Sequence, residues 1–478
     1  MQIRSDAYID GQWRSSASRF AVLNPATQAL IAEAPDLGAA ETEEAVAAAH
    51  AALPAWAAKA AKERAGILRA WYDLIMSDLD RLALLITLEG GKPLAEAKGE
   101  AAYGASFVEW FAEEAKRAYG RTIPTTTPTR RYVTIKQPVG VCAAVTPWNF
   151  PMAMITRKAA PALAAGCTIV LKPPSQTPLT ALALAELAER AGVPAGVFNV
   201  VTTDRASEVG RVMCESPLVR KFSFTGSTEV GKRLGAACVG STVKRVSLEL
   251  GGNAPLLVFA DADLDKAVKG AIASKFRNAG QTCVCANRIL VEDSIYDEFS
   301  KKLADAVSKL KVGDGQANGV EIGPLIDKNA IEKVEAMVAE ALGAGAVALT
   351  GGRRHEAGAQ FYTPTVLTNV SRDMRVNTEE IFGPVAPLIR FKNEDEAVAI
   401  ANDTPFGLAG YFFTQDVNRA WRVAERLEYG MVSINEGVFS NEVIPFGGWK
   451  ESGLGREGGV EGLEEYLETK FINFGGFA

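Results

Sequence analysis

The sequence predicts an α/β protein with two domains built on mostly parallel sheets, together with a small β arm. A chain of 478 residues exceeds what one hydrophobic core usually organises. From about residue 139, short apolar runs such as "VGVCAAV" and "CTIVLKPP" alternate with helical segments long enough for crossover connections. Before them, "RRYVTIKQPVG" alternates polar and apolar residues, which is typical of a hairpin strand.

The elements follow in order along the chain. Residues 40–118 repeat apolar side chains at three- and four-residue steps, which predicts helices over 38–53, 61–91 and 94–120. A hairpin arm is expected at 119–138, and the last strand candidate, "KFINF" (470–474), would pair with 131–136 in the same or a neighbouring subunit. The predicted units are 1–118 with 139–251 as a first domain, 252–446 as a second domain, 119–138 with 465–478 as the arm, and 447–464 returning to the first domain.

Composition excludes several classes of protein. The net charge is 51 − 57 = −6 with no dense Lys/Arg run, so a nucleic-acid partner is not expected. The longest apolar stretches, such as "LALLITL", fall far short of the ~20 residues of a membrane span. The N-terminal "MQIRSDAYIDGQW" is polar and lacks an apolar signal core. We therefore expect a soluble, cytoplasmic protein without a signal peptide.

Two cysteines stand one residue apart in "FRNAGQTCVCANR", at Cys283 and Cys285. The chain has only two histidines, His50 and His355, and neither is near these cysteines in sequence. A zinc site is not expected because the C-x-C pair lacks a second Cys/His pair, so no metal is predicted. If either thiol does chemistry, a group other than histidine must activate it.

A nucleotide site is indicated by two moderate signals, since no G-x-G-x-x-G follows a strand. In "VRKFSFTGSTEVGKRL", a strand Val219–Thr225, a turn at Gly226 and a following helix would make an anion site, although a purely structural turn uses the same residues. In "TIVLKPPSQTP", Lys172 ends a strand as a fixed cation or as an ordinary solvated lysine.

Three side chains have the chemistry of a catalytic site. Glu249 ends an apolar strand in "VSLELGGNAP", which predicts a raised pKa suited to a base, although a paired structural acid fits as well. Asn149 in "VTPWNFP" is a rigid amide that could donate to an oxyanion or form a turn. Cys283 follows Gly280, whose backbone can approach a ligand closely.

Taken together, these segments resemble the NAD(P)-dependent aldehyde dehydrogenase superfamily. "VTPWNFP", "VLKPPSQTP", "FTGSTEVG", "VSLELGGNAP", "FRNAGQTC", "EEIFGPV" and "PFGGWKESGLGRE" occur in the family's order and spacing, over essentially the whole chain. The resemblance implies an aldehyde dehydrogenase-like fold with two Rossmann-like domains and a β oligomerisation element. The first domain would bind the cofactor, the second would be catalytic, and the chain would form a homodimer or homotetramer.

The resemblance also implies roles for individual residues. Cys283 would attack the aldehyde, Asn149 would hold the oxyanion, and Glu249 would activate the water that hydrolyses the thioester. Lys158 and Glu457 match positions that support this proton transfer. The thiolate of Cys283 is expected to be favoured by backbone donors and bound cofactor, with Glu249 able to take the proton.

The same resemblance implies a cofactor site and a cofactor preference. The matching positions are Thr146, Pro147, Trp148, Lys172, Ser175, Gly210, Thr225, Gly226, Ser227, Val230, Leu250, Glu380 and Phe382. Many relatives that prefer NAD carry glutamate where this chain has Ser175, and that acid repels a 2′-phosphate. NADP is therefore expected to be accepted and preferred, with NAD as the other cofactor. Removing one repulsion is enough, because tenfold discrimination needs only ~1.4 kcal/mol.

The substrate is predicted from features of a subgroup. Arg157, Arg277 and Ser440, in "AMITRKA", "SKFRNAGQTC" and "FSNEVIPFGG", resemble succinate-semialdehyde dehydrogenases, in which they bind the substrate's far carboxylate. A guanidinium pair suits such a planar anion. Glu436 and Trp449 depart from the subgroup pattern. Glutarate semialdehyde, a sulfonated aldehyde or a neutral aldehyde are therefore the alternatives.

The sequence also allows two other classes of protein and a second use of the thiols. A coenzyme A-acylating dehydrogenase would not need Glu249, and a non-catalytic protein on this fold would have lost the thiol or the base. Cys285 is either a small packed residue or the partner of Cys283 in a reversible disulfide, which relatives with the C-x-C pair are suspected of forming. That span is strained unless the loop moves.

Overall fold

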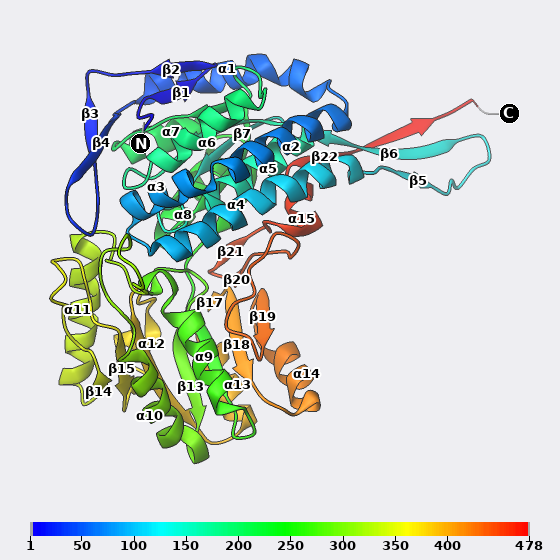
Figure 1. The fold of residues 1–478 in the computed structure, drawn as a ribbon. Coiled ribbons are helices and arrows are strands. Elements are labelled where there is room, and N and C mark those ends of the chain that lie inside the picture. The colour runs from blue at the N-terminus through cyan, green and yellow to red at the C-terminus, as the bar shows by residue number, and fades with distance from the viewer. Residues whose placement is uncertain (1–2, 477–478) are drawn as a thin grey trace.

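The computed structural model describes residues 3–476, which form two α/β domains and a projecting β arm (Figure 1). The first domain is built on an eight-stranded sheet with the order β2-β1-β9-β8-β7-β10-β11-β21. Its strands are β1 (Ala7–Ile9), β2 (Gln12–Arg14), β7 (Val141–Val145), β8 (Thr168–Lys172), β9 (Phe198–Val200), β10 (Val219–Thr225), β11 (Arg245–Glu249) and β21 (Gly453–Leu454). β9, β8, β7, β10 and β11 are parallel to one another.

Helices cover both faces of this sheet. They are α1 (Ala39–Ala57), α2 (Ala61–Ser77), α3 (Leu79–Gly90), α4 (Leu94–Glu114), η1 (Ala115–Arg117), α5 (Ala153–Ala165), α6 (Leu179–Arg190), α7 (Ala206–Glu215), α8 (Thr228–Ser241) and α15 (Gly459–Glu464). Alternate residues of β7 enter different cores, because successive side chains of a strand point to opposite faces. Cys142 and Ala144 pack with α2 to α6, whereas Val141 and Ala143 pack with α1 and α7.

The second domain has a seven-stranded sheet with the order β14-β15-β16-β13-β12-β18-β19, parallel except for β14. Its strands are β12 (Ala254–Val258), β13 (Ala286–Glu292), β14 (Val347–Thr350), β15 (Thr365–Thr368), β16 (Val385–Phe391), β18 (Ala409–Phe413) and β19 (Met431–Ile434). Its helices are α9 (Leu264–Lys275), η2 (Arg277–Gly280), η3 (Asp293–Ile295), α10 (Tyr296–Val307), α11 (Lys328–Gly343), α12 (Arg375–Thr378), α13 (Glu394–Asn402) and α14 (Val417–Arg426). A short ladder joins β17 (Phe406–Gly407) to β20 (Trp449–Lys450).

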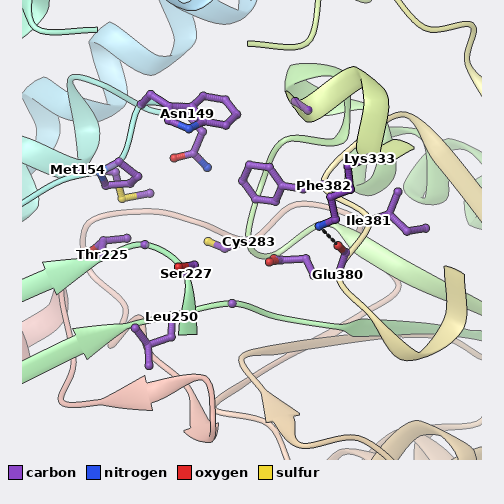
Figure 2. Close-up of a pocket in the computed structure, with 15 residues that line it drawn as sticks. Asn149, Met154, Thr225, Ser227, Leu250, Cys283, Lys333, Glu380, Ile381 and Phe382 are labelled. Carbon is purple, nitrogen blue, oxygen red and sulfur yellow. Dashed lines mark hydrogen bonds between the residues drawn. The ribbon is translucent and has the colours of Figure 1, made fainter. Parts of the chain in front are cut away.

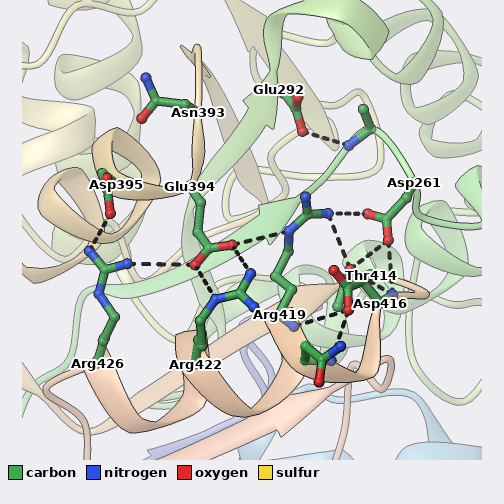
Figure 3. Close-up of polar contacts among 12 residues, drawn as sticks. Asp261, Glu292, Asn393, Glu394, Asp395, Thr414, Asp416, Arg419, Arg422 and Arg426 are labelled. Atoms are coloured by element: carbon green, nitrogen blue, oxygen red, sulfur yellow. Dashed lines mark hydrogen bonds and ion pairs between the residues drawn. The ribbon is translucent and has the colours of Figure 1, made fainter.

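An ionic cluster fastens the outer helices of the second domain (Figure 3). Glu394 at the start of α13 accepts hydrogen bonds from Arg419 and Arg422 of α14. Arg419 also pairs with Asp261, which lies in the loop after β12, at 2.6 Å. The cluster therefore ties α13 and α14 to the end of a central strand.

The arm consists of β5 (Arg121–Ile123), β6 (Arg131–Pro138) and β22 (Leu467–Phe474), and it projects away from both domains (Figure 1). The last strand pairs antiparallel with β6 in the same chain, with Ile472 opposite Val133, which confirms the predicted pairing and places it within one subunit. Phe471 and Phe474 on β22 are exposed.

Two local expectations differ from the structure. The helix expected over 61–91 is divided at Asp78, whose φ of −111° and ψ of 15° end α2 and precede α3. The segment before residue 38 also contains a small hairpin of β3 (Arg19–Leu23) and β4 (Leu30–Pro35), in addition to β1 and β2. These strands have three to six residues, and all except the buried β1 are partly exposed, so they lack the long apolar alternation that reveals a strand.

Candidate active site

The principal cleft lies where the order of the first sheet reverses. The chain runs from β7 outward to β8 and β9, then returns to place β10 and β11 on the other side of β7. Ligands of α/β sheets bind outside the carboxyl ends of strands at such a switch point. The cleft of about 290 Å³ is lined by Pro147, Trp148, Asn149, Met154, Thr225, Gly226, Ser227, Leu250, Gly251, Cys283, Ala330, Lys333, Glu380, Ile381 and Phe382 (Figure 2).

Cys283 reaches this cleft from the second domain, on the loop that enters β13. The loop makes a tight turn in which Asn278, Ala279 and Gly280 all have positive φ, at 50°, 55° and 76°. A Cβ on Gly280 would lie 2.1 Å from the carbonyl oxygen of Gly383, so this position requires glycine. The turn costs backbone strain and fixes where the thiol stands.

The Glu249 strand passes directly beneath this loop. A Cβ on Gly252 would stand 2.4 Å from the carbonyl oxygen of Cys283. The glycine therefore allows the segment that leaves β11 to approach the loop that carries the thiol. This contact brings together two segments that the sequence separates by more than 30 residues.

Asn149 is held toward the thiol loop by hydrogen bonds at both of its ends. Its side-chain Nδ2 donates to the carbonyl of Gln281 at 3.0 Å. Its backbone carbonyl accepts from Lys92 Nζ at 2.9 Å and from Asn278 Nδ2 at 3.0 Å. Lys92 is itself paired with Glu100, and all these side chains are buried. Lys92, Glu100 and Asn278 were not singled out in the sequence, where each looks like an ordinary polar residue.

The carboxyl group of Glu249 is buried at the end of β11, and neither of its oxygens has a hydrogen-bond partner among the described residues. Burial raises the pKa of Glu249 well above its usual value, and the charge of Glu457 raises it further. Arg157, Lys158 and Arg456 act in the opposite direction. The raised pKa expected from an acid in an apolar strand is therefore confirmed.

The surroundings of Cys283 in the structure favour its protonated form. Burial raises the pKa of Cys283 to about 12, and the carboxylate of Glu380 acts in the same direction, while Arg157 opposes them. Deprotonation of Cys283 therefore needs a base, and Glu249 is the carboxylate predicted to serve. The expected stabilisation of the thiolate by backbone donors and bound cofactor stays a prediction.

Eight of the predicted cofactor residues line the cleft, namely Pro147, Trp148, Thr225, Gly226, Ser227, Leu250, Glu380 and Phe382. The rings of Trp148 and Phe382 meet edge to face across it, with centroids 5.6 Å apart. The hydroxyl of Thr225 is buried there and has no hydrogen-bond partner within residues 3–476, so it is free to bind a polar ligand. These residues fit a dinucleotide lying over the carboxyl ends of β7 and β10.

Glu380 faces the cleft with a fixed orientation. Its Oε1 accepts from the backbone N–H of Gly252 at 3.1 Å, and burial raises its pKa to about 7. Lys333 of α11 donates to the backbone carbonyl of Glu380 at 2.7 Å (Figure 2). Lys333 was missed, since a lysine on an exposed helix carries no signal in the sequence.

The other predicted cofactor residues, Thr146, Lys172, Ser175, Gly210 and Val230, lie outside the lining of this cleft. Lys172 is buried at the end of β8, and burial lowers its pKa to about 8. Ser175 lines a separate cavity with Asp204 and Glu89. Gly210 lies on α7 with Leu234 of α8 next to it, 3.6 Å from an added Cβ.

A second cavity opens on the other side of the thiol. It is lined by Tyr103, Phe150, Met154, Arg157, Arg277, Thr282, Cys283, Val284, Ser440 and Phe446. It therefore joins the nucleophile candidate to all three residues predicted to bind a substrate carboxylate. Glu436 and Trp449, which raised doubt about an anion, are exposed and line neither cavity.

Cys285 points away from both cavities into the second domain. Its Sγ lies 3.3 Å from the carbonyl oxygen of Gly280 and 3.7 Å from Nζ of the buried Lys275. Both Cys283 and Cys285 are free thiols in this structure. Within residues 3–476, no group of three or more His, Cys, Asp and Glu side chains is placed to hold a metal ion.

No helix in the described part of the chain combines the length and apolar character that crossing a membrane requires.

Comparison with known proteins agrees with this architecture. The model of the aldehyde dehydrogenase family matches residues 13–472. The chain is 60% identical over 474 residues to the succinate-semialdehyde dehydrogenase [NADP(+)] GabD of Escherichia coli K12, which covers 99% of this chain and 98% of that protein. It is 59% identical over 475 residues to a glutarate-semialdehyde dehydrogenase of Pseudomonas aeruginosa, with the same coverage.

A solved structure gives the same result for the fold. The crystal structure of an NADP-dependent enzyme from E. coli matches with a TM-score of 0.98 at 60% identity, over 99% of this chain and 98% of that one. The predicted fold class, two α/β domains of aldehyde dehydrogenase type, is confirmed. The protein belongs to the aldehyde dehydrogenase family.

Proposed function

We propose that the protein oxidises an aldehyde carrying a distal anionic group, with succinate semialdehyde as the best candidate, using NADP or NAD. The observation that carries this proposal is in the second cavity. Arg157 is buried beside Cys283, and its Nη2 has no hydrogen-bond partner among the described residues. A buried guanidinium edge without a partner is costly unless a ligand satisfies it, and a carboxylate does so best.

Cys283 and Asn149 carry the first half of the proposed reaction. The proton of Cys283 passes to Glu249, and the sulfur forms a bond to the aldehyde carbon while the carbonyl π electrons move to oxygen. The amide of Asn149 and the backbone N–H of Cys283 stabilise that oxyanion. Trp148 and Glu380 of the cleft would hold a nicotinamide dinucleotide, which would supply the hydride acceptor for this carbon. The C=O bond re-forms and leaves a thioester on Cys283.

Glu249 carries the second half. After releasing the Cys283 proton to solvent, it accepts a proton from water, whose oxygen attacks the thioester carbon. The C–S bond breaks, the sulfur leaves with the electron pair and takes up the proton held by Glu249, and the carboxylic acid is released. Lys158 contacts Glu457 and donates to Ser223 Oγ at 2.9 Å, so we propose that these two residues support the proton transfer.

The cofactor preference rests on the segment after β8. Lys172 is a buried cation with a neutral residue, Ser175, three positions later. The absence of an acid at position 175 removes a repulsion toward a 2′-phosphate, which supports a preference for NADP. The relative GabD from E. coli is named as an NADP enzyme.

The proposal is tested with a kinetic panel on the purified protein. Succinate semialdehyde, glutarate semialdehyde, a sulfonated aldehyde and butanal are compared, each with NADP and NAD. We expect kcat/KM for succinate semialdehyde to exceed that for butanal by about tenfold or more, because two guanidinium groups bind its carboxylate. NADP is expected to give the higher kcat/KM. Equal values for butanal and the anionic aldehydes would contradict the anion site, and a clear advantage for NAD would contradict the role of Ser175.

Glutarate semialdehyde is the second candidate substrate, because a relative 59% identical is named for it. It has one more methylene, and such a difference in an apolar pocket changes discrimination only by about 10–200-fold. The panel ranks the two directly.

We further propose that the chain assembles as a homodimer or homotetramer through the arm. The exposed phenylalanines of β22 support this, because large apolar side chains on a projecting sheet are costly in water.

We retain as a proposal that Cys283 and Cys285 form a reversible disulfide. The backbone N–H of Cys285 donates to Thr282 at 3.1 Å, so this turn would have to open first. Peroxide should then inactivate the wild type in a manner that dithiothreitol reverses, and C285A should not recover. Identical recovery of the two proteins would leave Cys285 as a packed residue.

A further inference from the structure

One buried carboxylate joins two cations on successive residues of α5. Nε of Arg157 lies 2.9 Å from Oε2 of Glu457, while Lys158 Nζ contacts the other oxygen, Oε1. All three side chains are almost fully buried. The charges of Lys158 and Arg157 hold the pKa of Glu457 below its usual value, although burial acts to raise it. Glu457 is therefore ionised and forms ion pairs with both Arg157 and Lys158.

The position of Arg157 is fixed by the same segment that supplies Glu457. Its guanidinium stacks on the ring of Phe446, 3.9 Å from the centroid, with Phe107 nearby at 5.6 Å. Phe446 and Glu457 form a β-bridge, with N–H···O distances of 2.7 and 2.8 Å in the two directions. Backbone hydrogen bonds therefore join the aromatic ring that supports Arg157 to its carboxylate partner.

The guanidinium of Arg157 therefore has one side paired by charge and one side without a partner. Nε forms an ion pair with Glu457 that lacks hydrogen-bond geometry, and Nη2 has no hydrogen-bond partner among the described residues, while Arg157 lines the cavity beside Cys283. Arg277 lines the same cavity and packs over Phe150 at 5.3 Å. No carboxylate among the described residues lies within ion-pair distance of Arg277. The two arginines therefore share the cavity but differ in their connection to Glu457.

Glu249 is the group that this arrangement affects. The charges acting on its carboxyl group come from Glu457, which raises its pKa, and from Arg157, Lys158 and Arg456, which lower it. Arg157 and Lys158 come from α5, and the other two come from the segment after β21. Loss of Arg157 would remove a positive charge that lowers the pKa of Glu249. It would also leave Lys158 as the remaining ion-pair partner of Glu457.

We propose that Arg157 is a positioning residue for Glu457, the carboxylate proposed to support proton transfer at the base Glu249, as well as a ligand for the substrate anion. This inference rests on the proposed role of Glu249. It predicts that Arg157 matters even for an aldehyde without an anionic group, because the Glu457 edge of its guanidinium works whether or not the cavity holds a carboxylate. A pure substrate anchor would matter only for anionic aldehydes.

The test compares R157M with R277M, since both changes remove one guanidinium from the same cavity. Turnover of butanal and of succinate semialdehyde is measured from pH 5 to 10, together with the pre-steady-state burst of NADPH. With butanal, R157M should lower kcat by about tenfold, since general-base catalysis contributes about 10²–10⁴-fold. The acid limb of its pH profile should move up by about one unit, because a nearby positive charge has been lost.

R157M should also show a burst of NADPH followed by slow turnover, because acylation continues while hydrolysis slows. R277M should raise KM for succinate semialdehyde but leave the acid limb where it is in the wild type. R157K keeps the positive charge but loses the planar guanidinium that stacks on Phe446. The acid limb of its pH profile should therefore lie closer to that of the wild type. If R157M does not fold, R157K and R277K form the corresponding pair, and a slower hydrolysis step only in R157K supports the proposal.

The inference is overturned if R157M and R277M give the same acid limb and the same burst with butanal. Failure of the anion site has a different signature, because neither variant would then change KM for succinate semialdehyde. Failure of Glu249 as the base would appear as an acid limb that E249Q leaves unchanged.

Discussion

Replacing Cys283 by alanine should abolish aldehyde oxidation, with a loss of activity of about 10⁴-fold or more. The thiol is the only nucleophile candidate that lies in both the cofactor cleft and the cavity of the two arginines, among the residues that line them. Removing a covalent nucleophile eliminates the step that splits the reaction into acylation and hydrolysis. The measurement is NADPH formation at saturating succinate semialdehyde.

C285A is the matched control, since it removes the neighbouring thiol that points away from both cavities. We expect this variant to keep wild-type turnover. Cofactor binding by C283A, followed through the fluorescence of Trp148 in the cleft, should persist and would show that the site is still folded. Substantial activity in C283A would exclude the thioester mechanism.

Replacing Glu249 by glutamine should lower steady-state turnover by about 10²–10⁴-fold and leave the thioester unhydrolysed. The amide has nearly the same shape as the carboxyl group but cannot take a proton from water. At a pH above the pKa of Glu380, a stopped-flow experiment should show one equivalent of NADPH per active site, followed by very slow release. Because the pKa of Cys283 is raised to about 12, we also expect this burst to be slower than in the wild type.

The pH dependence of wild-type turnover follows from the protonation of Glu249. Burial raises the pKa of Glu249, and its base form is needed, so turnover should increase with pH through that pKa and lose its acid limb in E249Q. Adding coenzyme A to the assay distinguishes this mechanism from that of a coenzyme A-acylating dehydrogenase. If coenzyme A sustained turnover in both the wild type and E249Q, the protein would be an acylating dehydrogenase.

Sequence patterns located the elements of the site closely wherever the signal was local. The strand Val219–Thr225 has the boundaries expected from its apolar run and following turn, and the strands Thr168–Lys172 and Arg245–Glu249 end at the residues expected. Such runs depend on residues a few positions apart, and backbone sterics act over the same range. For that reason the ends of strands, where Lys172 and Glu249 stand, could be predicted.

The contacts between the two domains could not be predicted from such local patterns. The carboxyl ends of β7 and β10 face the loop that enters β13, and Gly252 passes within contact distance of Cys283. The Lys92–Glu100 pair that holds Asn149 joins the connection between α3 and α4 to α4 itself, and neither segment carries a catalytic pattern. Burial, which sets the pKa of Cys283 so high, also depends on packing rather than on neighbours in the sequence.

The sequence by itself determined the family to which the chain belongs, and it predicted the chemistry proposed for the site: a thiol, a carboxyl group and an amide at identifiable chain positions, and two arginines for an anion. Only the tertiary structure decided that Arg157 shares its guanidinium between Glu457 and the cavity, and that Arg277 does not. The physical reason is that periodicity and turn chemistry act over a few residues. An ion pair between positions 157 and 457 exists only after two distant segments have packed together and excluded water.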